Sequence, residues 1–313
     1  MKKTLFFLIL TVFVCSFSYA QRVYIAGIDG NDAVFWLNGT RIVLPKASTY
    51  AGANSIAVSG SNIYIAGYDG DDAVYWLNGV RNVLPKIGTE AYASVINISG
   101  SNVYIGGYDD EDAVYWLNGR REVLPGDGDY AEATGIAISG SDIYISGIEF
   151  FYDCCDDDFP CYDSVYWRNN EQIYLEYNNC QSNSFNITIS GSNIYIVGDD
   201  TGEAVYWLNG NKTVLPRLSK RAAAMGIAVS GSNVHIVGYD GDDAVYWLNG
   251  KQTVLPKRRT SSHILATAIA LSGNNVYISG CDDEDAVYWL NGNRNVLPRT
   301  GNSAHAIDIV VVR

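Results

Sequence analysis

The sequence predicts an all-β fold, a seven-bladed β-propeller whose four-stranded antiparallel blades form one closed ring. A Val-Tyr-Trp-Leu-Asn-Gly motif, or a near variant of it, recurs at a period of about 40 residues. Each copy divides into four short apolar runs, and the two chain ends carry partial copies that together complete one copy. The seven tryptophans that mark the copies are Trp36, Trp76, Trp116, Trp167, Trp207, Trp247 and Trp289.

The turns divide each copy into its expected strands. In the second copy the apolar runs are Ser55–Gly60, Ile63–Gly67, Ala73–Trp76 and Val83–Pro85. Asn78-Gly79, between the third and fourth runs, is a strong β-hairpin signal. Val and Ile alternate with Tyr and Ala rather than with charged residues, as expected for strands that are covered on both faces by neighbouring blades.

The chain ends indicate how the ring closes. The first strand-like run, Val23–Gly27, matches a second strand without its first, and the last, Ile307–Val312, matches a first strand without its second. We therefore expect the C-terminal strand to complete the N-terminal blade, which leaves no open edge at the join. Six fourth strands are expected to end in a proline that blunts the outer edge, and blade four has Ile173–Glu176 instead.

The first 20 residues resemble a secretory signal peptide. Lys2 and Lys3 precede the apolar run Leu5–Phe17, and small residues at positions 18 and 20 suit cleavage after Ala20. We expect residues 21–313 to form a single propeller domain, a secreted or periplasmic monomer with no membrane insertion. Lipoprotein processing at Cys15 is disfavoured because Phe13 and Val14 are bulky.

One repeat resembles a known family. Gly135-Ile136-Ala137-Ile138-Ser139-Gly140-Ser141-Asp142-Ile143-Tyr144-Ile145 looks like the opening half of an NHL-type propeller repeat. The chain is also similar to uncharacterised exported bacterial proteins with V-Y-W-x-N-G strands. The resemblance covers Arg22 to Arg313 and implies that the second-to-third and fourth-to-first loops share one face of the disc, the top face. The NHL family lacks the repeated tryptophan, so only its strand order is carried over.

Charge distinguishes the two faces of the expected disc. The formal net charge is −13, and most acidic residues lie in the second-to-third loops, which predicts an acidic top face. Basic residues such as Arg41, Arg81 and Lys212 are expected in the third-to-fourth loops, which predicts a mildly positive bottom face. This pattern favours a cationic partner and disfavours nucleic acid, whose phosphates need basic contacts.

The loop carboxylates fall into two groups. Those at the same position in every copy, such as Asp29 and Asp32, are expected to hydrogen-bond the turn backbone. Those in the middle of the loops, including Asp110 and Glu111, vary and are candidates for ligand binding. Calcium is an alternative, but the loops lack the ordered ligand spacing of a dedicated calcium site, so we expect no cofactor and no metal.

The fourth copy departs most from the pattern. An insertion at about residues 148–163 combines aromatic residues with an aspartate run, a composition suited to recognition of a protein or glycan. A structural flap over the channel mouth is the alternative. The candidate contacts in this loop are Phe150, Phe151, Tyr152, Asp156, Asp157, Asp158 and Tyr162.

The cysteines favour disulfides over a metal site. Cys154, Cys155, Cys161 and Cys180 are expected on the same face, and in an exported protein two disulfides among them are the default. The pairing is left open, and a zinc site is the alternative. Cys281 lies in blade seven and is expected to be a free thiol.

The sequence therefore predicts a non-catalytic, exported binding module that recognises a protein or glycan through an acidic, aromatic-containing top face. The alternative is a lyase or hydrolase that acts on a polysaccharide or peptide across the channel, using carboxylates such as Asp110, Glu111 and Glu284. A scaffold without a small ligand is a third reading. His235, His263 and His305 are expected to be core or turn residues, because no nucleophile with a base and an orienting acid is visible.

Overall fold

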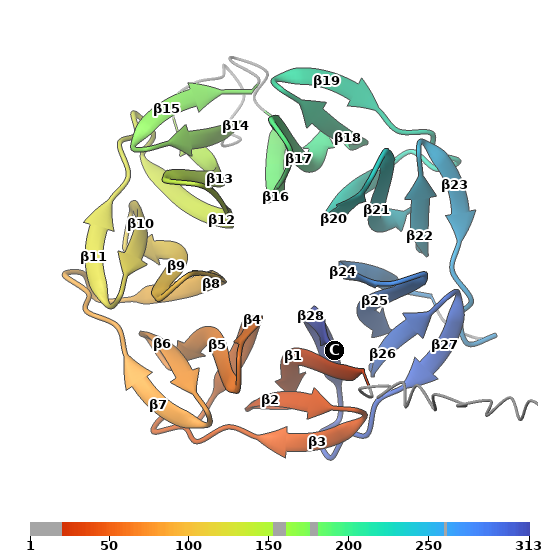
Figure 1. Cartoon of the computed structure of the whole chain (residues 1–313), viewed down its shortest axis with the longest axis horizontal. Coiled ribbons are helices and arrows are strands. Elements are labelled where there is room, and N and C mark those ends of the chain that lie inside the picture. Colours follow the sequence, from red (N-terminus) through yellow and green to blue (C-terminus); the bar gives the residue numbers. More distant parts are fainter. Residues whose placement is uncertain (1–20, 153–160, 176–180, 260–261) are drawn as a thin grey trace, which may run out of the picture.

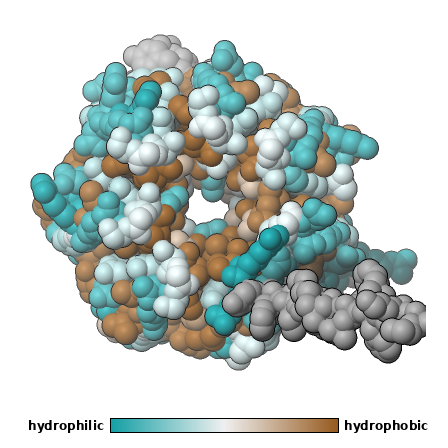
Figure 2. Space-filling model, in the orientation of Figure 1, coloured by the Kyte–Doolittle hydropathy of each residue, from teal (hydrophilic) through white to brown (hydrophobic). Residues whose placement is uncertain are grey.

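The computed structural model describes residues 21–152, 161–175, 181–259 and 262–313. Seven four-stranded antiparallel sheets stand in a ring around an open centre, and the described part contains no helix (Figure 1). The space-filling view shows the central opening (Figure 2). The prediction of an all-β, seven-bladed propeller is confirmed.

The blades are numbered in chain order, and each has four strands counted outward from the channel. The inner strands are β28 (Ala304–Val312), β4 (Ala51–Ser59), β8 (Ala91–Ser99), β12 (Tyr130–Ser139), β16 (Ser182–Ser190), β20 (Ala222–Ser230) and β24 (Ile264–Ser272). The second strands are β1 (Arg22–Asp29), β5 (Asn62–Asp69), β9 (Asn102–Asp109), β13 (Asp142–Phe151), β17 (Asn193–Asp200), β21 (Asn233–Asp240) and β25 (Asn275–Asp282). The third strands are β2 (Asp32–Leu37), β6 (Asp72–Leu77), β10 (Asp112–Leu117), β14 (Cys161–Arg168), β18 (Glu203–Leu208), β22 (Asp243–Leu248) and β26 (Asp285–Leu290). The fourth strands are β3 (Thr40–Val43), β7 (Val80–Val83), β11 (Arg120–Val123), β15 (Glu171–Tyr174), β19 (Asn211–Val214), β23 (Lys251–Val254) and β27 (Asn293–Val296).

The ring closes as predicted. Strand β28 pairs antiparallel with β1, with Val312 opposite Arg22 at one end and Ala304 opposite Asp29 at the other. Blade 1 is therefore built from both ends of the chain. The predicted signal peptide, residues 1–20, lies outside the described residues.

The fourth strands begin earlier than predicted. In blade 2 the strand is Val80–Val83 rather than Val83–Pro85. Asn78 and Gly79 both have positive φ, 52° and 80°, so a two-residue turn completes the reversal and pairing resumes at once. The inner strand also begins earlier than predicted, at Ala51.

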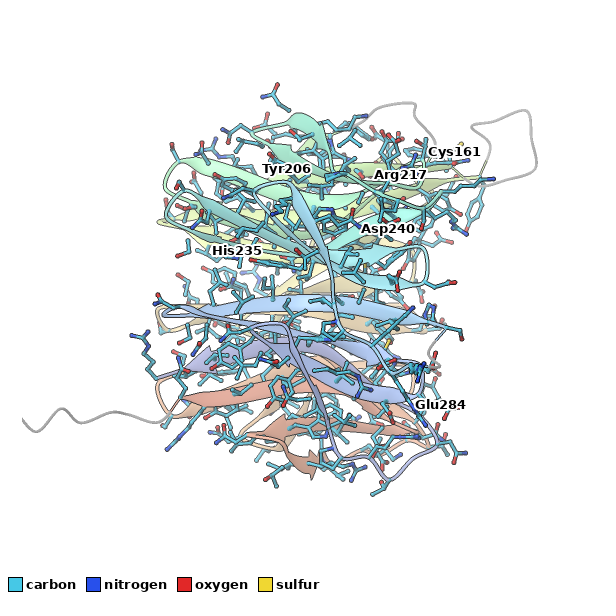
Figure 3. All side chains as sticks on the ribbon, turned by 90° about the vertical axis from the view of Figure 1, so that its right-hand side faces the viewer. Cys161, Tyr206, Arg217, His235, Asp240 and Glu284 are labelled. Atoms are coloured by element: carbon cyan, nitrogen blue, oxygen red, sulfur yellow. The ribbon has the colours of Figure 1, made fainter. Side chains whose placement is uncertain are left out.

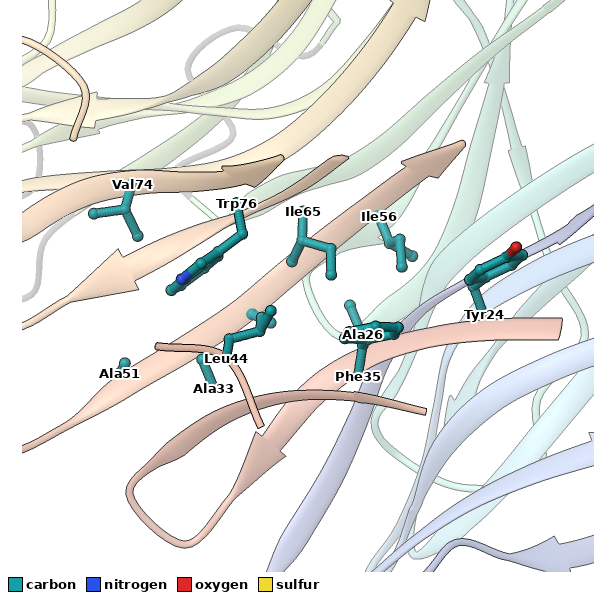
Figure 4. Packing of buried hydrophobic residues seen from close by; sticks show 11 residues of the cluster. Tyr24, Ala26, Ala33, Phe35, Leu44, Ala51, Ile56, Ile65, Val74 and Trp76 are labelled. Atoms are coloured by element: carbon teal, nitrogen blue, oxygen red, sulfur yellow. The ribbon is translucent and has the colours of Figure 1, made fainter. Parts of the chain in front are cut away.

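Each tryptophan joins two neighbouring blades. Trp76 is fully buried in a cluster that includes Ile65 and Val74 of its own blade and Leu44 from the preceding blade (Figure 4). Its indole Nε1–H donates to the carbonyl oxygen of Pro45 at 2.8 Å. The same bond links Trp36 to Pro298, Trp116 to Pro85, Trp167 to Pro125, Trp247 to Pro216 and Trp289 to Pro256.

These prolines lie beyond the fourth strands and do not end them: β3 stops at Val43, two residues before Pro45. Their position places a carbonyl oxygen beside the next blade's indole, where the buried N–H needs an acceptor. We call this repeated contact the Trp–Pro clasp. It explains why both residues recur with the blade period.

The inner strands carry a feature that the sequence pattern did not reveal. Each has one extra residue where its register with the second strand shifts, a β-bulge. The extra residues all line the central channel, which has a cavity of ≈ 330 Å³. They are Asn54, Ser94, Thr134, Phe185, Met225, Thr267 and Ile307.

The insertion of blade 4 begins and ends as strand rather than as loop. β13 runs to Phe151 and β14 starts at Cys161, with Phe150 paired opposite Tyr162. Aromatic residues favour extended structure, which explains the longer hairpin. Residues 148–151 and 161–163 of the predicted loop are therefore sheet.

Candidate functional site

The top face is the face with the second-to-third and fourth-to-first loops. In the side view, one face of the disc carries the labels of Cys161, Arg217, Asp240 and Glu284, and His235 lies nearer the opposite face (Figure 3). The structure therefore agrees with the expectation that the second-to-third and fourth-to-first loops share one face of the disc.

Recurring carboxylates hold the top-face turns. Asp69 accepts backbone N–H bonds from Ala47 at 2.6 Å and Ser48 at 2.9 Å, and it forms an ion pair with Arg81. Burial raises the pKa of Asp69, but the backbone bonds and Arg81 outweigh it and leave the pKa below its ordinary value. Equivalent backbone bonds are made by Asp29, Asp109, Asp240 and Asp282. The turn-building role predicted for these positions is confirmed. The prediction is wrong for the carboxylates before the third strand, such as Asp32, which forms an ion pair with Lys46 instead of bonding the turn backbone.

Many basic residues neutralise this acidic ring. The prediction of a positive bottom face is wrong for Arg41, Arg81 and Lys212, because they lie in the fourth strands and their side chains form ion pairs with top-face carboxylates. Other cations of the top face are paired too: Lys46 with Asp32, Lys86 with Asp72, Arg217 with Glu203, Lys257 with Asp243 and Arg299 with Asp285. The recurring acids and bases thus belong to the scaffold.

One ring of positions around the channel mouth varies from blade to blade. It consists of facing residues near the top ends of the inner and second strands, and we call it the inner rim. From blade 1 to blade 7 the pairs are His305–Ile28, Gly52–Tyr68, Tyr92–Tyr108, Glu132–Ile148, Asn183–Asp199, Ala223–Tyr239 and Leu265–Cys281. The scaffold positions are nearly identical in all blades, so the rim is where the blades of the top face differ most.

An unbroken row of aromatic rings covers the rim of blades 2 to 4. Successive ring centroids are 4.3 to 6.1 Å apart, in the range of stacked and edge-to-face contacts. We call this row the aromatic arc. Its members are Tyr50, Tyr68, Tyr92, Tyr108, Tyr130, Phe150 and Tyr162.

A glycine makes room for the arc. A Cβ atom at Gly52 would lie 2.5 Å from the Tyr68 ring, so only glycine allows that ring to lie across the inner strand. The Tyr68 ring then stacks on Tyr92, with centroids 4.3 Å apart. The next ring, Tyr108, is nearly parallel to Tyr92, at an interplanar angle of 7°.

Carboxylates without cationic partners accompany the arc. Glu132 accepts a hydrogen bond from Ser94 Oγ at 2.7 Å, and burial raises its pKa. Asp71 accepts a bond from the Tyr50 hydroxyl at 2.9 Å, and Glu90 is exposed. Within the described part of the chain none of these three acids forms an ion pair, so the arc carries net negative charge.

A polar pocket of ≈ 370 Å³ begins where the arc ends. Tyr162 belongs to both, and Tyr239 lines the opposite side. Asp199 lies in this pocket and accepts a bond from Asn183 Nδ2 at 3.2 Å. Burial raises the pKa of Asp199 to about 6. The remaining lining residues are Gln181, Thr201, Gly202 and Arg221.

The predicted blade-four contacts are divided between these regions. Phe150 and Tyr162 belong to the arc, whereas Phe151 is half-buried and Tyr152 is 67% exposed. Asp156, Asp157 and Asp158 lie outside the described residues. The five other arc residues were missed because their tyrosines were interpreted as blade packing, and a comparison of equivalent positions across the copies would have revealed them.

The two predicted mid-loop carboxylates differ from each other. Asp110 has a positive φ of 51°, and its Oδ1 accepts backbone N–H bonds from Thr89 and Glu90, so it shapes a turn. Glu111 is exposed, and its backbone carbonyl accepts a bond from Ala131. Neither side chain belongs to the aromatic arc or to the polar pocket.

The cysteine and histidine predictions have mixed outcomes. Cys281 is a free, buried thiol, as predicted. Cys161 is buried at the start of β14, and Cys154, Cys155 and Cys180 lie outside the described residues, so the disulfides stay a prediction. His235 is a buried strand residue bonded to the Tyr246 hydroxyl at 2.7 Å, which confirms its core role.

Comparison with known proteins supports the fold alone. No protein-family model matches the sequence, and no curated protein matches it. Among solved structures, the chain is similar to YCF48 bound to a D1 peptide, with 10% identity, a TM-score of 0.51 and coverage of 81% of this chain and 85% of that one. It is also similar to apo AztD from Citrobacter koseri, with 11% identity, a TM-score of 0.51 and coverage of 93% and 98%.

The described residues lack a metal-binding cluster and a membrane-spanning helix. They contain no group of three or more His, Cys, Asp or Glu side chains placed to hold a metal ion. Nor do they form a helix long and apolar enough to cross a membrane.

Proposed function

We propose that this protein is an exported binding module that recognises a protein segment or a glycan across the inner rim of its top face. The observation that carries the proposal is the aromatic arc. Tyrosine-rich surfaces supply large, stiff contact area at low entropic cost and keep a polar tip for hydrogen bonds. Export rests on the signal-peptide pattern of residues 1–20, and the NHL-like character on the repeat of blade 4.

The arc has features of a binding surface rather than of a core. Six of its seven rings are half-buried and Tyr50 is exposed. Burial raises the pKa of Tyr108 to about 12, so its hydroxyl remains a hydrogen-bond donor at physiological pH. The unpaired carboxylates Glu90 and Glu132 add acceptors and favour cationic or hydroxyl-rich ligands. YCF48, which has the same fold, was solved with a peptide bound, a precedent for a propeller as a recognition scaffold.

The proposal is tested by affinity capture from the source organism's envelope and medium. We compare the wild-type protein with the arc variant Tyr92→Ala and with the control Ile87→Ala. Ile87 is 83% exposed in an outer top-face loop, so its truncation removes apolar surface from the same face outside the arc. A ligand held by the wild type and the control but lost by Tyr92→Ala supports the proposal.

Equal capture by all three proteins contradicts the role of the arc. The same assay separates a module from an enzyme that acts across the channel. A module loses affinity in graded steps as single rim residues are removed, whereas an enzyme loses turnover of the captured ligand by orders of magnitude when one carboxylate is removed.

A further inference from the structure

The polar pocket contains the rim's most unusual substitution. At the position of Asp199 the other six blades have Ile28, Tyr68, Tyr108, Ile148, Tyr239 and Cys281. A half-buried carboxylate without an ion pair opposes folding, since it loses hydration that its neighbours only partly replace. Such a residue persists where a ligand uses it.

The partners of Asp199 leave it able to accept more hydrogen bonds. Its carboxylate accepts a bond from Asn183 Nδ2 at 3.2 Å, whereas a carboxylate has about four acceptor sites. Arg221 lines the same pocket, and no ion pair joins it to Asp199 in the described structure. The two charges therefore face the pocket separately.

The pocket lining supplies both hydrogen-bond donors and hydrogen-bond acceptors. Asp199 only accepts, Arg221 only donates, and the amides and hydroxyls of the other side chains do both. The formal charges cancel, so the pocket suits neither a strong cation, which Arg221 would repel, nor a strong anion, which Asp199 would repel. Two tyrosine rings supply flat apolar surface, and Tyr239 has no ring contact among the described residues.

We propose that the pocket bounded by Tyr162, Asp199, Arg221 and Tyr239 binds a neutral sugar residue, the unit of a glycan whose neighbouring units lie over the aromatic arc. A sugar's hydroxyl groups both donate and accept, and its C–H faces pack on aromatic rings. The volume of ≈ 370 Å³ falls at the lower end of small-molecule pockets, about 300–1,000 Å³, which suits one or two sugar rings.

This inference rests on the proposed function and names its ligand class. The two sites are contiguous because Tyr162 lines both, so a chain that leaves the pocket reaches Phe150, 4.8 Å from Tyr162 between ring centroids. The glycan thus has a defined anchor at one end of the arc.

The test is binding of the purified protein to an array of neutral, uronate-bearing and sulfated oligosaccharides, printed beside lysine- and arginine-containing peptides. We compare the wild type with Asp199→Asn and with the control Asp242→Asn. Asp242 is an exposed carboxylate that lines the adjacent pocket instead of this one. A melting curve for each variant establishes that it is folded.

The expected result is binding to neutral glycans that falls at least tenfold in Asp199→Asn and is unchanged in Asp242→Asn. Retention only of anionic glycans, of basic peptides or of nothing overturns the sugar assignment. So does neutral-glycan binding that survives Asp199→Asn. If Tyr92→Ala still abolishes ligand capture in those cases, the proposed function stands and only the pocket's ligand is wrong.

Discussion

The outer part of each blade is nearly the same in all blades, whereas the inner rim differs from blade to blade. The Trp–Pro clasp and the Asp69-type turns recur around the ring with the same atoms in the same roles. At the rim, equivalent positions hold residues as different as Gly52, Glu132 and Leu265. Uniformity therefore marks what stabilises the ring, and variation marks the surface that we propose as the ligand site.

The largest expected loss of stability comes from a substitution that breaks the Trp–Pro clasp. Trp116→Ala removes a fully buried indole and leaves the Pro85 carbonyl without its donor, which should cost about 3–5 kcal/mol of the free energy of unfolding. Urea unfolding measures the loss. A cost below about 1 kcal/mol would show that the tryptophans do not hold the blades together.

The second largest loss of stability is expected from removing the charge of a turn carboxylate. Asp69→Asn breaks a buried ion pair with Arg81 and should cost about 3 kcal/mol at pH 7. The folded-state pKa of Asp69 is lowered, so its stabilisation is present above the ordinary value of 3.8 and is lost as the pH falls through the folded-state pKa. Unfolding at a series of pH values should show the wild type and the variant converging in acid. A gap independent of pH contradicts this.

At the rim, a carboxylate has the opposite effect on the free energy of unfolding. The pKa of Asp199 is raised from 3.8 to about 6, so its charge opposes folding above pH 6, and that cost vanishes below 3.8. Asp199→Asn should therefore stabilise the protein by about 2 kcal/mol at pH 8, with the gain shrinking between pH 6 and pH 4. Thermal melts at these pH values provide the measurement. A variant less stable than the wild type at pH 8 would mean that Asp199 is structural.

The smallest stability effect is expected at the end of the arc. Tyr50 is 43% exposed, so Tyr50→Ala should change the free energy of unfolding by no more than about 0.5 kcal/mol. Ligand capture should nevertheless weaken, because Tyr50 is the first ring of the arc and contacts Tyr68. A stability loss without a capture loss would assign this ring to the scaffold.

The repeat made the fold predictable from sequence. The tryptophan period, the Asn78-Gly79 turn and the complementary chain ends specified seven blades and their closure, because each rests on local geometry that every copy repeats. The clasp was not foreseen, since the bond from Trp76 to Pro45 joins residues of different blades. The channel-lining bulges also depend on pairing between strands rather than on residue type.

The site was only partly predictable. Phe150 and Tyr162 were noticed because they belong to an irregular segment. Tyr92 and Tyr108 were not, because a tyrosine in a strand has the same pattern whether it packs between blades or faces the channel mouth. Asp199 was equally hidden, since its burial follows from its place opposite Asn183.

The most direct test of the account is hydrogen–deuterium exchange of the protein with and without the ligand recovered by affinity capture. We predict slowed exchange in the rim segments around Tyr68, Tyr92 and Tyr130, and unchanged exchange in the bottom-face turns such as Asn78-Gly79. Protection confined to the bottom turns or to the outer strands would contradict the claim that the variable rim is the recognition site.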